Sequence, residues 1–351
     1  MQTLNIFTKQ PDTLGDGKAD FLLAASVTKT CEIEGITQAG IPGMIPLTPT
    51  LDAEFITNQE VFSLGELAET PKGVPTPAII TRAVHNLHPF STIEILNLGL
   101  DTPAQNTTLH NFDIPSSESI TSGANIDAKA VFQKGMDAGR SYELKGNYLI
   151  LGESTPSGTT TALATALALG FECENDFSSS FKDVPDDIKN KTVQKALSLL
   201  NDEMNSFEKL SLVSDNMLIF CAGFIIEASR RFHVVLAGGT QMAATLLVAD
   251  KLKEEILMRA KSDNITLATT EWVVDDKNSD IVHILSELSY TPHAIYTTFS
   301  FEKATIPVLH KYDEGEAKEG VGAGAALAYA HTNNINNPQL LEQIEYILYS
   351  M

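Results

Sequence analysis

Residues 146–170 constrain the fold of this chain more than any other stretch does. They read GNYLILGESTPSGTTTALATALALG. Residues 148–151 form a short apolar run that is typical of a strand buried on both faces, and residues 159–169 have the length and composition of a buried helix. The small-residue loop between them, 152–158, presents unpaired backbone N–H groups to an anion at the helix N-terminus. The stretch therefore predicts either an anion-binding loop or an ordinary connection between a strand and a helix.

Further apolar runs and helical patterns continue this alternation along the chain. Strands are predicted at 21–27, 93–98, 232–237, 265–269 and 295–299, and helices at 78–87, 126–142, 185–204, 241–261, 279–288 and 339–349. Thr76 is expected to cap the helix at 78–87, with Pro77 as its first residue. Such alternation is typical of a mostly parallel sheet covered by helices on both faces. Ligands bind these sheets at the carboxyl ends of the strands, where we expect Glu153, Gly238 and Gly239 to lie.

The charge balance excludes several classes of partner. A net charge of −21 and an isoelectric point near 4.7 argue against a nucleic-acid surface or an anionic membrane. A bound anion must then be held by local backbone dipoles and a few side chains, which favours a small ligand in a pocket. The cysteines, at 31, 173 and 221, show no paired spacing. No signal-peptide pattern and no apolar run long enough to span a bilayer is evident, so we expect a cytoplasmic protein.

Several other motifs limit the chemistry. The absence of a Lys beside Thr159 excludes a standard Walker A loop, and the histidines show no metal-ligand spacing, so no metal is expected. Asp275 and Asp276 resemble the acidic pair of diphosphate-dependent phosphoribosyltransferases, but the phosphate loop that should follow is absent, which favours a surface turn. Glu319 lies between a charged stretch and a small-residue stretch. There a carboxylate either gains basicity by desolvation close to a ligand or remains solvated.

Five stretches together resemble one family, the nicotinate-nucleotide:dimethylbenzimidazole phosphoribosyltransferases of cobalamin assembly, and most closely its archaeal branch. They are TPTLDAEF (48–55), GVPTPAIITRA (73–83), GESTPSGTTTA (152–162), VVLAGGTQM (234–242) and KEGVGAGAALA (318–328), in family order over almost the whole chain. The resemblance implies a doubly wound three-layer α/β/α fold, a smaller part built from the chain ends, and a homodimer. With a boundary in the polar segment before residue 126, we expect an N-terminal region (1–125), a nucleotide-binding core (126–312) and a C-terminal catalytic loop with helices (313–351).

The resemblance also implies a reaction and a site. A benzimidazole-type or purine base attacks C1′ of nicotinate mononucleotide, nicotinate leaves, and an α-ribosyl 5′-phosphate forms without a cofactor. Glu319 matches the catalytic base of the family, and Glu153 is a candidate secondary base or ribose contact. The substrate-binding residues implied are Ser157, Gly158, Thr159, Thr160, Gly238, Gly239, Thr240, Gly320 and Gly322.

Departures from the family pattern leave the accepted base open. Ser157-Gly158 stands where the bacterial enzymes carry Gly-Asn, Ala237-Gly238-Gly239 stands where they carry Asp-Gly-Phe, and the archaeal branch usually has glycine in place of Ser157. The role of Arg82 is open as well. Two rival functions are a catalytically silent mononucleotide-binding protein and a Mg²⁺-dependent phosphoribosyltransferase that uses Asp275 and Asp276.

Overall fold

A single parallel sheet organises the chain. The computed structural model describes residues 6–9, 14–15, 17–182, 185–258 and 260–351. Within them, eight strands pair in parallel in the order β1-β8-β7-β6-β5-β2-β3-β4. The strands are β1 (Phe7–Lys9), β2 (Ala19–Ala25), β3 (Thr92–Asn97), β4 (Leu109–Asn111), β5 (Tyr148–Ser154), β6 (Val234–Ala237), β7 (Ile265–Thr270) and β8 (His293–Thr297).

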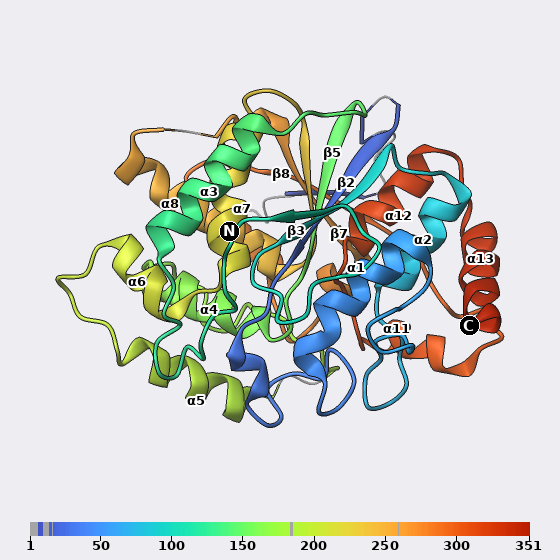
Figure 1. Cartoon of the computed structure of the whole chain (residues 1–351), viewed down its shortest axis with the longest axis horizontal. Helices are drawn as coiled ribbons and strands as arrows, with labels where there is room; N and C mark the ends of the chain where they lie inside the picture. Colours follow the sequence, from blue (N-terminus) through green and yellow to red (C-terminus); the bar gives the residue numbers. More distant parts are fainter. Residues whose placement is uncertain (1–5, 10–13, 16, 183–184, 259) are drawn as a thin grey trace.

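Helices cover both faces of this sheet, which confirms the three-layer α/β/α fold (Figure 1). On one face lie α3 (Ala128–Ser141), α4 (Gly158–Ala168), α7 (Asn216–Ala228) and α8 (Thr240–Ile256), with α5 (Asp186–Leu197), α6 (Ser206–Val213) and α10 (Ile281–Ser286) beside them. On the other face lie helices from both ends of the chain, namely α1 (Thr48–Asn58), α2 (Ala78–Leu87), α12 (Ala323–Thr332) and α13 (Asn337–Ser350). Short helices are α9 (Glu271–Val274), α11 (His310–Asp313), η1 (Lys29–Glu32), η2 (Ile45–Leu47), η3 (Ser262–Asn264) and η4 (Pro307–Leu309).

Each face of the sheet has its own hydrophobic core. Along β2, Leu22 and Ala24 join the core under α3, α4, α7 and α8, whereas Phe21 and Leu23 join the core under α1, α2, α12 and α13. Successive side chains of a strand point to opposite faces, so a strand buried on both faces needs a continuous apolar run. This requirement explains why the apolar runs of the sequence locate most of the strands.

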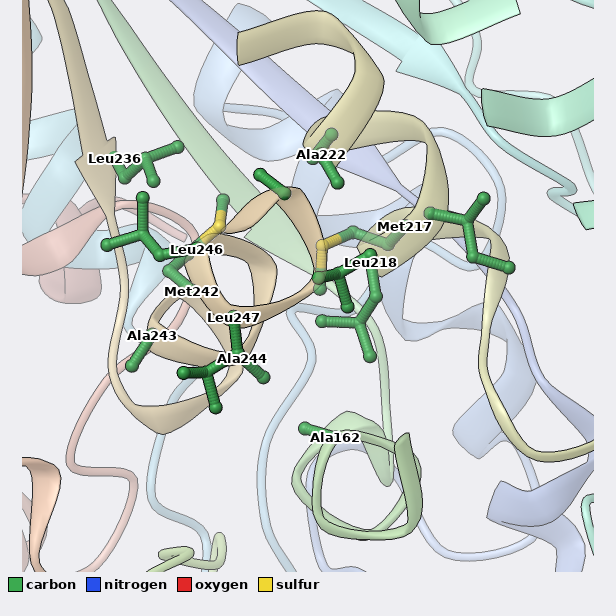
Figure 2. Close-up of a cluster of buried hydrophobic side chains, with 14 of the residues drawn as sticks. Ala162, Met217, Leu218, Ala222, Leu236, Met242, Ala243, Ala244, Leu246 and Leu247 are labelled. Carbon is green, nitrogen blue, oxygen red and sulfur yellow. The ribbon is translucent and has the colours of Figure 1, made fainter. Parts of the chain in front are cut away.

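The first core also fixes the two helices that begin at the site. Ala162 of α4, Met217 and Leu218 of α7, Met242 and the following residues of α8, and Leu236 of β6 belong to one buried cluster (Figure 2). All of these side chains are buried. Burial of a Leu or Met side chain contributes about 1.5–3 kcal/mol, so this cluster holds the N-termini of α4 and α8 in fixed positions.

The order of the strands reverses between β2 and β5. From β2 the chain builds outward through β3 and β4, whereas from β5 it builds the other way through β6, β7 and β8. The connection after β2 contains α1 and α2 on one face, and the connection after β5 begins with α4 on the other face. Such a switch point leaves a crevice outside the carboxyl ends of the strands, which here are Ala25 and Ser154.

Several predicted boundaries were wrong for identifiable reasons. Strand β5 continues to Ser154 instead of ending at residue 151. Helix α5 ends at Leu197, and Asn205 caps α6 through its side chain, so Leu200 and Met204 do not belong to the helix predicted at 185–204. Residue 259, inside the helix predicted at 241–261, lies outside the described residues, and α8 ends at Ile256.

Short edge strands and one helix start also differ from the expectation. β1 was not predicted, and β4 lies inside the segment 101–125 that was expected to be an irregular surface connection. Helix α2 begins at Ala78, one residue later than expected, although Thr76 Oγ1 still accepts a hydrogen bond from the Ala78 N–H at 3.3 Å. None of the helices in the described ranges is both long and apolar enough to cross a bilayer. The division of the chain at residues 125 and 312 stays a prediction.

Candidate functional site

A pocket opens at the carboxyl ends of β5, β6 and β7, beside the switch point. It encloses about 920 Å³ of empty space, its open mouth included. The sequence-predicted residues that line it are Glu153, Ser157, Gly158, Thr159, Gly239, Thr240, Glu319 and Gly320. Residues far apart in the sequence are therefore brought to one place, as expected for loops that follow neighbouring parallel strands.

The remaining predicted residues support this pocket from behind. Thr160 is buried in the first turn of α4. A side chain at Gly238 would collide with Met242, and one at Gly322 would collide with the ring of Phe21. These three residues pack against the protein and do not line the pocket.

One side of the pocket has hydrogen-bond donors without partners among the described residues. Helices α4 and α8 both begin there, and neither has a side-chain cap. Thr155, Ser157 and Thr240 also line the pocket, and their hydroxyls are buried without a hydrogen-bond partner among the described residues. A buried hydroxyl without a partner costs about 1–3 kcal/mol. Two helix N-termini and three unsatisfied donors therefore suit an anion with several acceptor oxygens.

Positions 157 and 158 of this loop favour small residues. A Cβ on Gly158 would lie 2.0 Å from Nε2 of Gln241. Ser157 has a left-handed backbone with φ of 62°. A side chain in that conformation costs roughly 1–2 kcal/mol, so glycine would fit this position with less strain. Unlike glycine, Ser157 carries a hydroxyl, and that hydroxyl is one of the unsatisfied donors.

Glu319 lines the pocket beside Gly239, the N-cap of α8. Its Oε2 accepts hydrogen bonds from the Thr270 N–H at 3.1 Å and from Thr269 Oγ1 at 3.4 Å. Its Oε1 accepts from the Gly324 N–H at 3.0 Å and the Gly320 N–H at 3.3 Å. These donors favour the charged form, but removal from water outweighs them and raises the pKa of Glu319 to about 7. A carboxylate with that pKa is suited to general base catalysis near neutral pH.

Glu153, at the end of β5, is a second acid in the same pocket. Burial is the main cause that raises its pKa to about 8, and the charges of Glu319, Asp215 and Asp52 add to it. Gln241 Nε2 donates a hydrogen bond to Glu153 Oε2 at 3.1 Å. Near pH 7 Glu153 is therefore mostly protonated, whereas Glu319 is divided between its two forms. The two environments thus suit Glu153 to act as an acid and Glu319 to act as a base.

Asp52 of α1 is a third acid lining the pocket, and sequence reasoning did not assign it. Ser154 Oγ and Thr76 Oγ1 each donate a hydrogen bond to it at 2.7 Å. Burial raises the pKa of Asp52 to about 6. The available signal was an acidic residue among the apolar residues of the stretch LDAEF, which also contains Glu54.

Lys318 and Asp276 form a buried ion pair at the pocket wall, and this pair was also missed. Lys318 Nζ lies 3.1 Å from Asp276 Oδ2, and the two side chains are 3% and 4% exposed. The interpretation of 275–276 as a surface turn is thus wrong for Asp276, although Asp275 is exposed. Asp276 also accepts hydrogen bonds from the hydroxyls of Ser178 and Ser279.

Arg82 lies outside this site. Its Nη1 donates to the carbonyls of Ile56 and Thr57 at 3.0 and 2.8 Å. Arg82 therefore satisfies carbonyls at the C-terminal end of α1, where cations are favourable. Among the described residues, no group of three or more His, Cys, Asp or Glu side chains is placed to hold a metal ion.

Comparisons with known proteins extend over almost the whole chain. No family model matches it. UPF0284 proteins from the archaea Sulfolobus acidocaldarius and Archaeoglobus fulgidus are each 33% identical over 337 residues, covering 95% of this chain and 95% and 94% of the relatives. A UPF0284 protein from Methanocaldococcus jannaschii is 33% identical over 330 residues, 91% of this chain and 92% of the relative.

Two solved structures share the fold. They are nicotinate-nucleotide-dimethylbenzimidazole phosphoribosyltransferase and CobT, both from Thermus thermophilus, each with a TM-score of 0.60 and 18% identity. The alignments cover 97% and 95% of this chain and 84% of each solved chain. At this identity the likeness is one of fold. It confirms the doubly wound α/β architecture, and the relatives fit the archaeal branch that the sequence indicated.

Proposed function

This chain belongs to the UPF0284 protein family, and from that premise we propose that it is a phosphoribosyltransferase acting on nicotinate mononucleotide. It moves the ribosyl 5′-phosphate to a benzimidazole-type or purine base and releases nicotinate. One observation carries the proposal: a single pocket pairs an anion cradle with the half-buried carboxylate of Glu319, whose pKa is raised to about 7. The fold shared with the Thermus thermophilus enzymes supports the same reaction class.

The two sides of the pocket adjoin each other. A Cβ built on Gly239, the N-cap of α8, would lie 3.7 Å from Cβ of Glu319. A mononucleotide whose phosphate binds at the N-termini of α4 and α8 would therefore bring its ribose toward the acidic side. The hydroxyls of Thr155, Ser157 and Thr240 would donate to the phosphate oxygens and thereby gain the partners they lack.

The proposed reaction requires the protein to align the incoming base with C1′ and to accept one proton. The pyridinium ring is a good leaving group because its charge is neutralised as the bond to C1′ breaks. Alignment of the incoming base with C1′ contributes about 7–11 kcal/mol. Glu319 takes the N–H proton of the attacking azole, a contribution of about 10²- to 10⁴-fold in rate. Protonated Glu153 donates a hydrogen bond to the ribose or to the incoming base.

Mass spectrometry of the reaction products tests this function. The purified protein is incubated with nicotinate mononucleotide and a mixture of benzimidazoles and purines, and both nicotinate and α-ribosyl phosphates are measured. The proposal expects nicotinate in equal amount to one or more ribosylated bases, with and without EDTA. A Mg²⁺ requirement would support the diphosphate-dependent rival. Mononucleotide binding in calorimetry without any product would support a silent binding protein.

We extend the proposal to the assembly. The resemblance that predicts the reaction also predicts a homodimer, and light scattering on the eluting protein measures its mass directly. A monomeric mass at micromolar concentration would contradict the proposed dimer but would not bear on the proposed reaction.

A further inference from the structure

The acidic side of the pocket poses a problem for one part of the proposed substrate. Asp52, Glu153 and Glu319 all line the pocket. Nicotinate mononucleotide carries a ring carboxylate in addition to its phosphate. A second carboxylate among buried acids is repelled unless a cation accompanies it, because interactions between charges are strong where water is excluded.

Lys318 is the only Lys, Arg or His that lines the pocket within the described residues. Its Nζ lies 3.1 Å from Asp276 Oδ2 and donates to the Phe181 carbonyl at 2.9 Å. An ammonium group has three N–H donors, so two of them are accounted for by these partners. The third has no acceptor among the described residues, and an acceptor on a ligand in the pocket would complete the set.

The carboxylate of Asp276 accepts hydrogen bonds from other donors besides Lys318, so it does not fully neutralise the charge of the Lys318 ammonium. Besides Lys318, Asp276 accepts hydrogen bonds from the Ser178 and Ser279 hydroxyls at 2.9 and 3.0 Å and from the Asn278 N–H at 3.1 Å. These donors share the stabilisation of its negative charge. Asp276 therefore holds Lys318 in place without neutralising its positive charge completely.

The backbone fixes Lys318 relative to the reacting centre. Thr270 Oγ1 donates to the Lys318 carbonyl at 2.6 Å, while the N–H of the same Thr270 binds the carboxylate of Glu319. The ammonium and the candidate base thus come from consecutive residues anchored on the end of β7. A substrate ring that contacts Lys318 is placed within reach of the acidic side.

We propose that Lys318 pairs with the ring carboxylate of the mononucleotide and thereby selects nicotinate mononucleotide over its nicotinamide counterpart. The inference rests on the proposed function and adds a specificity-determining residue to it. The nicotinamide analogue has the same phosphate, ribose and pyridinium, but a neutral amide replaces the carboxylate. Loss of one charge-assisted hydrogen bond in a buried site corresponds to roughly 10- to 100-fold in discrimination.

The test compares the two mononucleotides in Lys318→Met. The measured quantity is the ratio of kcat/KM for nicotinate mononucleotide to kcat/KM for nicotinamide mononucleotide, together with the ratio of their Kd values by calorimetry. Any loss of stability or general misplacement affects both substrates alike and cancels in these ratios. We expect Lys318→Met to lower the preference for nicotinate mononucleotide about 10- to 100-fold in both measures, and Lys318→Arg to retain most of the selectivity.

Control variants separate this pairing from a structural role. Lys318→Met combined with Asp276→Asn avoids an unpaired buried charge and should lower the preference equally. Lys72→Met removes a lysine that binds Glu316 outside the pocket lining, and it should keep the preference within a few-fold of the wild type. If the wild type turns over nicotinate mononucleotide and Lys318→Met keeps the preference, the pairing is wrong. If the wild type binds neither mononucleotide, the proposed function falls with it.

Discussion

Gln241 connects the two helix starts of the pocket, because its Nε2 donates to Glu153 Oε2 at 3.1 Å and lies against Gly158. Glu153 lies near the end of β5, Gly158 begins α4, and Gln241 lies in the first turn of α8. The contact joins the proposed phosphate cradle to the proposed acid. Anything that displaces Gln241 should therefore disturb both.

Gly158→Ala tests this relationship. Its Cβ would lie 2.0 Å from Gln241 Nε2, so the Gln241 side chain must move and lose its bond to Glu153. Alanine normally stabilises a helix over glycine by about 0.5–1 kcal/mol. Here we expect the reverse, a loss of about 1 kcal/mol in the free energy of unfolding, because the end of the Gln241 side chain moves and Glu153 loses a hydrogen bond. Urea denaturation measures it, and a gain in stability would show that Gln241 is not confined.

The two pocket glutamates make stability depend on pH. Their pKa values rise from the 4.5 of an ordinary glutamate to about 8 for Glu153 and about 7 for Glu319. The folded protein thus holds more protons than the unfolded chain in this window, so unfolding releases protons. Their contribution is complete below pH 4.5 and is lost as the pH rises through 7 and 8.

The expected slope is at most about 1.4 kcal/mol per pH unit for each group. Urea titrations between about pH 7 and 9 measure it, because Asp52 and Asp215, with pKa values of about 6, and the histidines with lowered pKa values, His85, His88 and His233, contribute mainly below this range. Glu153→Gln should flatten the slope. A free energy of unfolding that stays constant or rises over this range in the wild type contradicts the raised pKa values.

Thr240→Val should change stability and binding in opposite directions. The Thr240 hydroxyl is buried without a partner among the described residues, so its removal should raise the free energy of unfolding by about 1 kcal/mol. The same change removes a donor from the proposed phosphate cradle and should weaken mononucleotide binding about 10-fold.

Thr165→Val is the matched control for this effect. Thr165 also has a buried hydroxyl without a partner among the described residues, but it does not line the pocket. It should gain similar stability without a change in affinity. Equal affinities for wild type and Thr240→Val in calorimetry would remove Thr240 from the phosphate site.

The sequence located the layers of the fold and one end of the site well. Strands buried on both faces appear as apolar runs, and the loop before α4 was recognisable from its small residues. The edge strands β1 and β4 were missed because a short, partly exposed strand needs no apolar run, and its pairing depends on a neighbour distant in the chain. The helix predicted through Leu200 and Met204 was wrong because α5 ends at Leu197 and Asn205 caps a new helix, α6, through its side chain.

Site residues whose roles depend on distant partners were harder to predict. Glu153 and Glu319 were identified from a resemblance, and no local pattern shows that their pKa values rise together. Asp276 looked like part of a surface turn because its partner Lys318 belongs to another segment of the chain. Asp52 was overlooked for the same reason, since Ser154 and Thr76 come from other elements.

Turnover by Glu319→Gln tests the central claim most directly. Nicotinate release is measured under single-turnover conditions beside Glu314→Gln, which changes an exposed glutamate of the same segment. Thermal unfolding and mononucleotide calorimetry verify that each variant folds and binds. The account predicts a loss of about 10²- to 10⁴-fold for Glu319→Gln with mononucleotide affinity largely kept, and wild-type rates for Glu314→Gln. Near-normal nicotinate release by Glu319→Gln would contradict the assignment of Glu319 as the base.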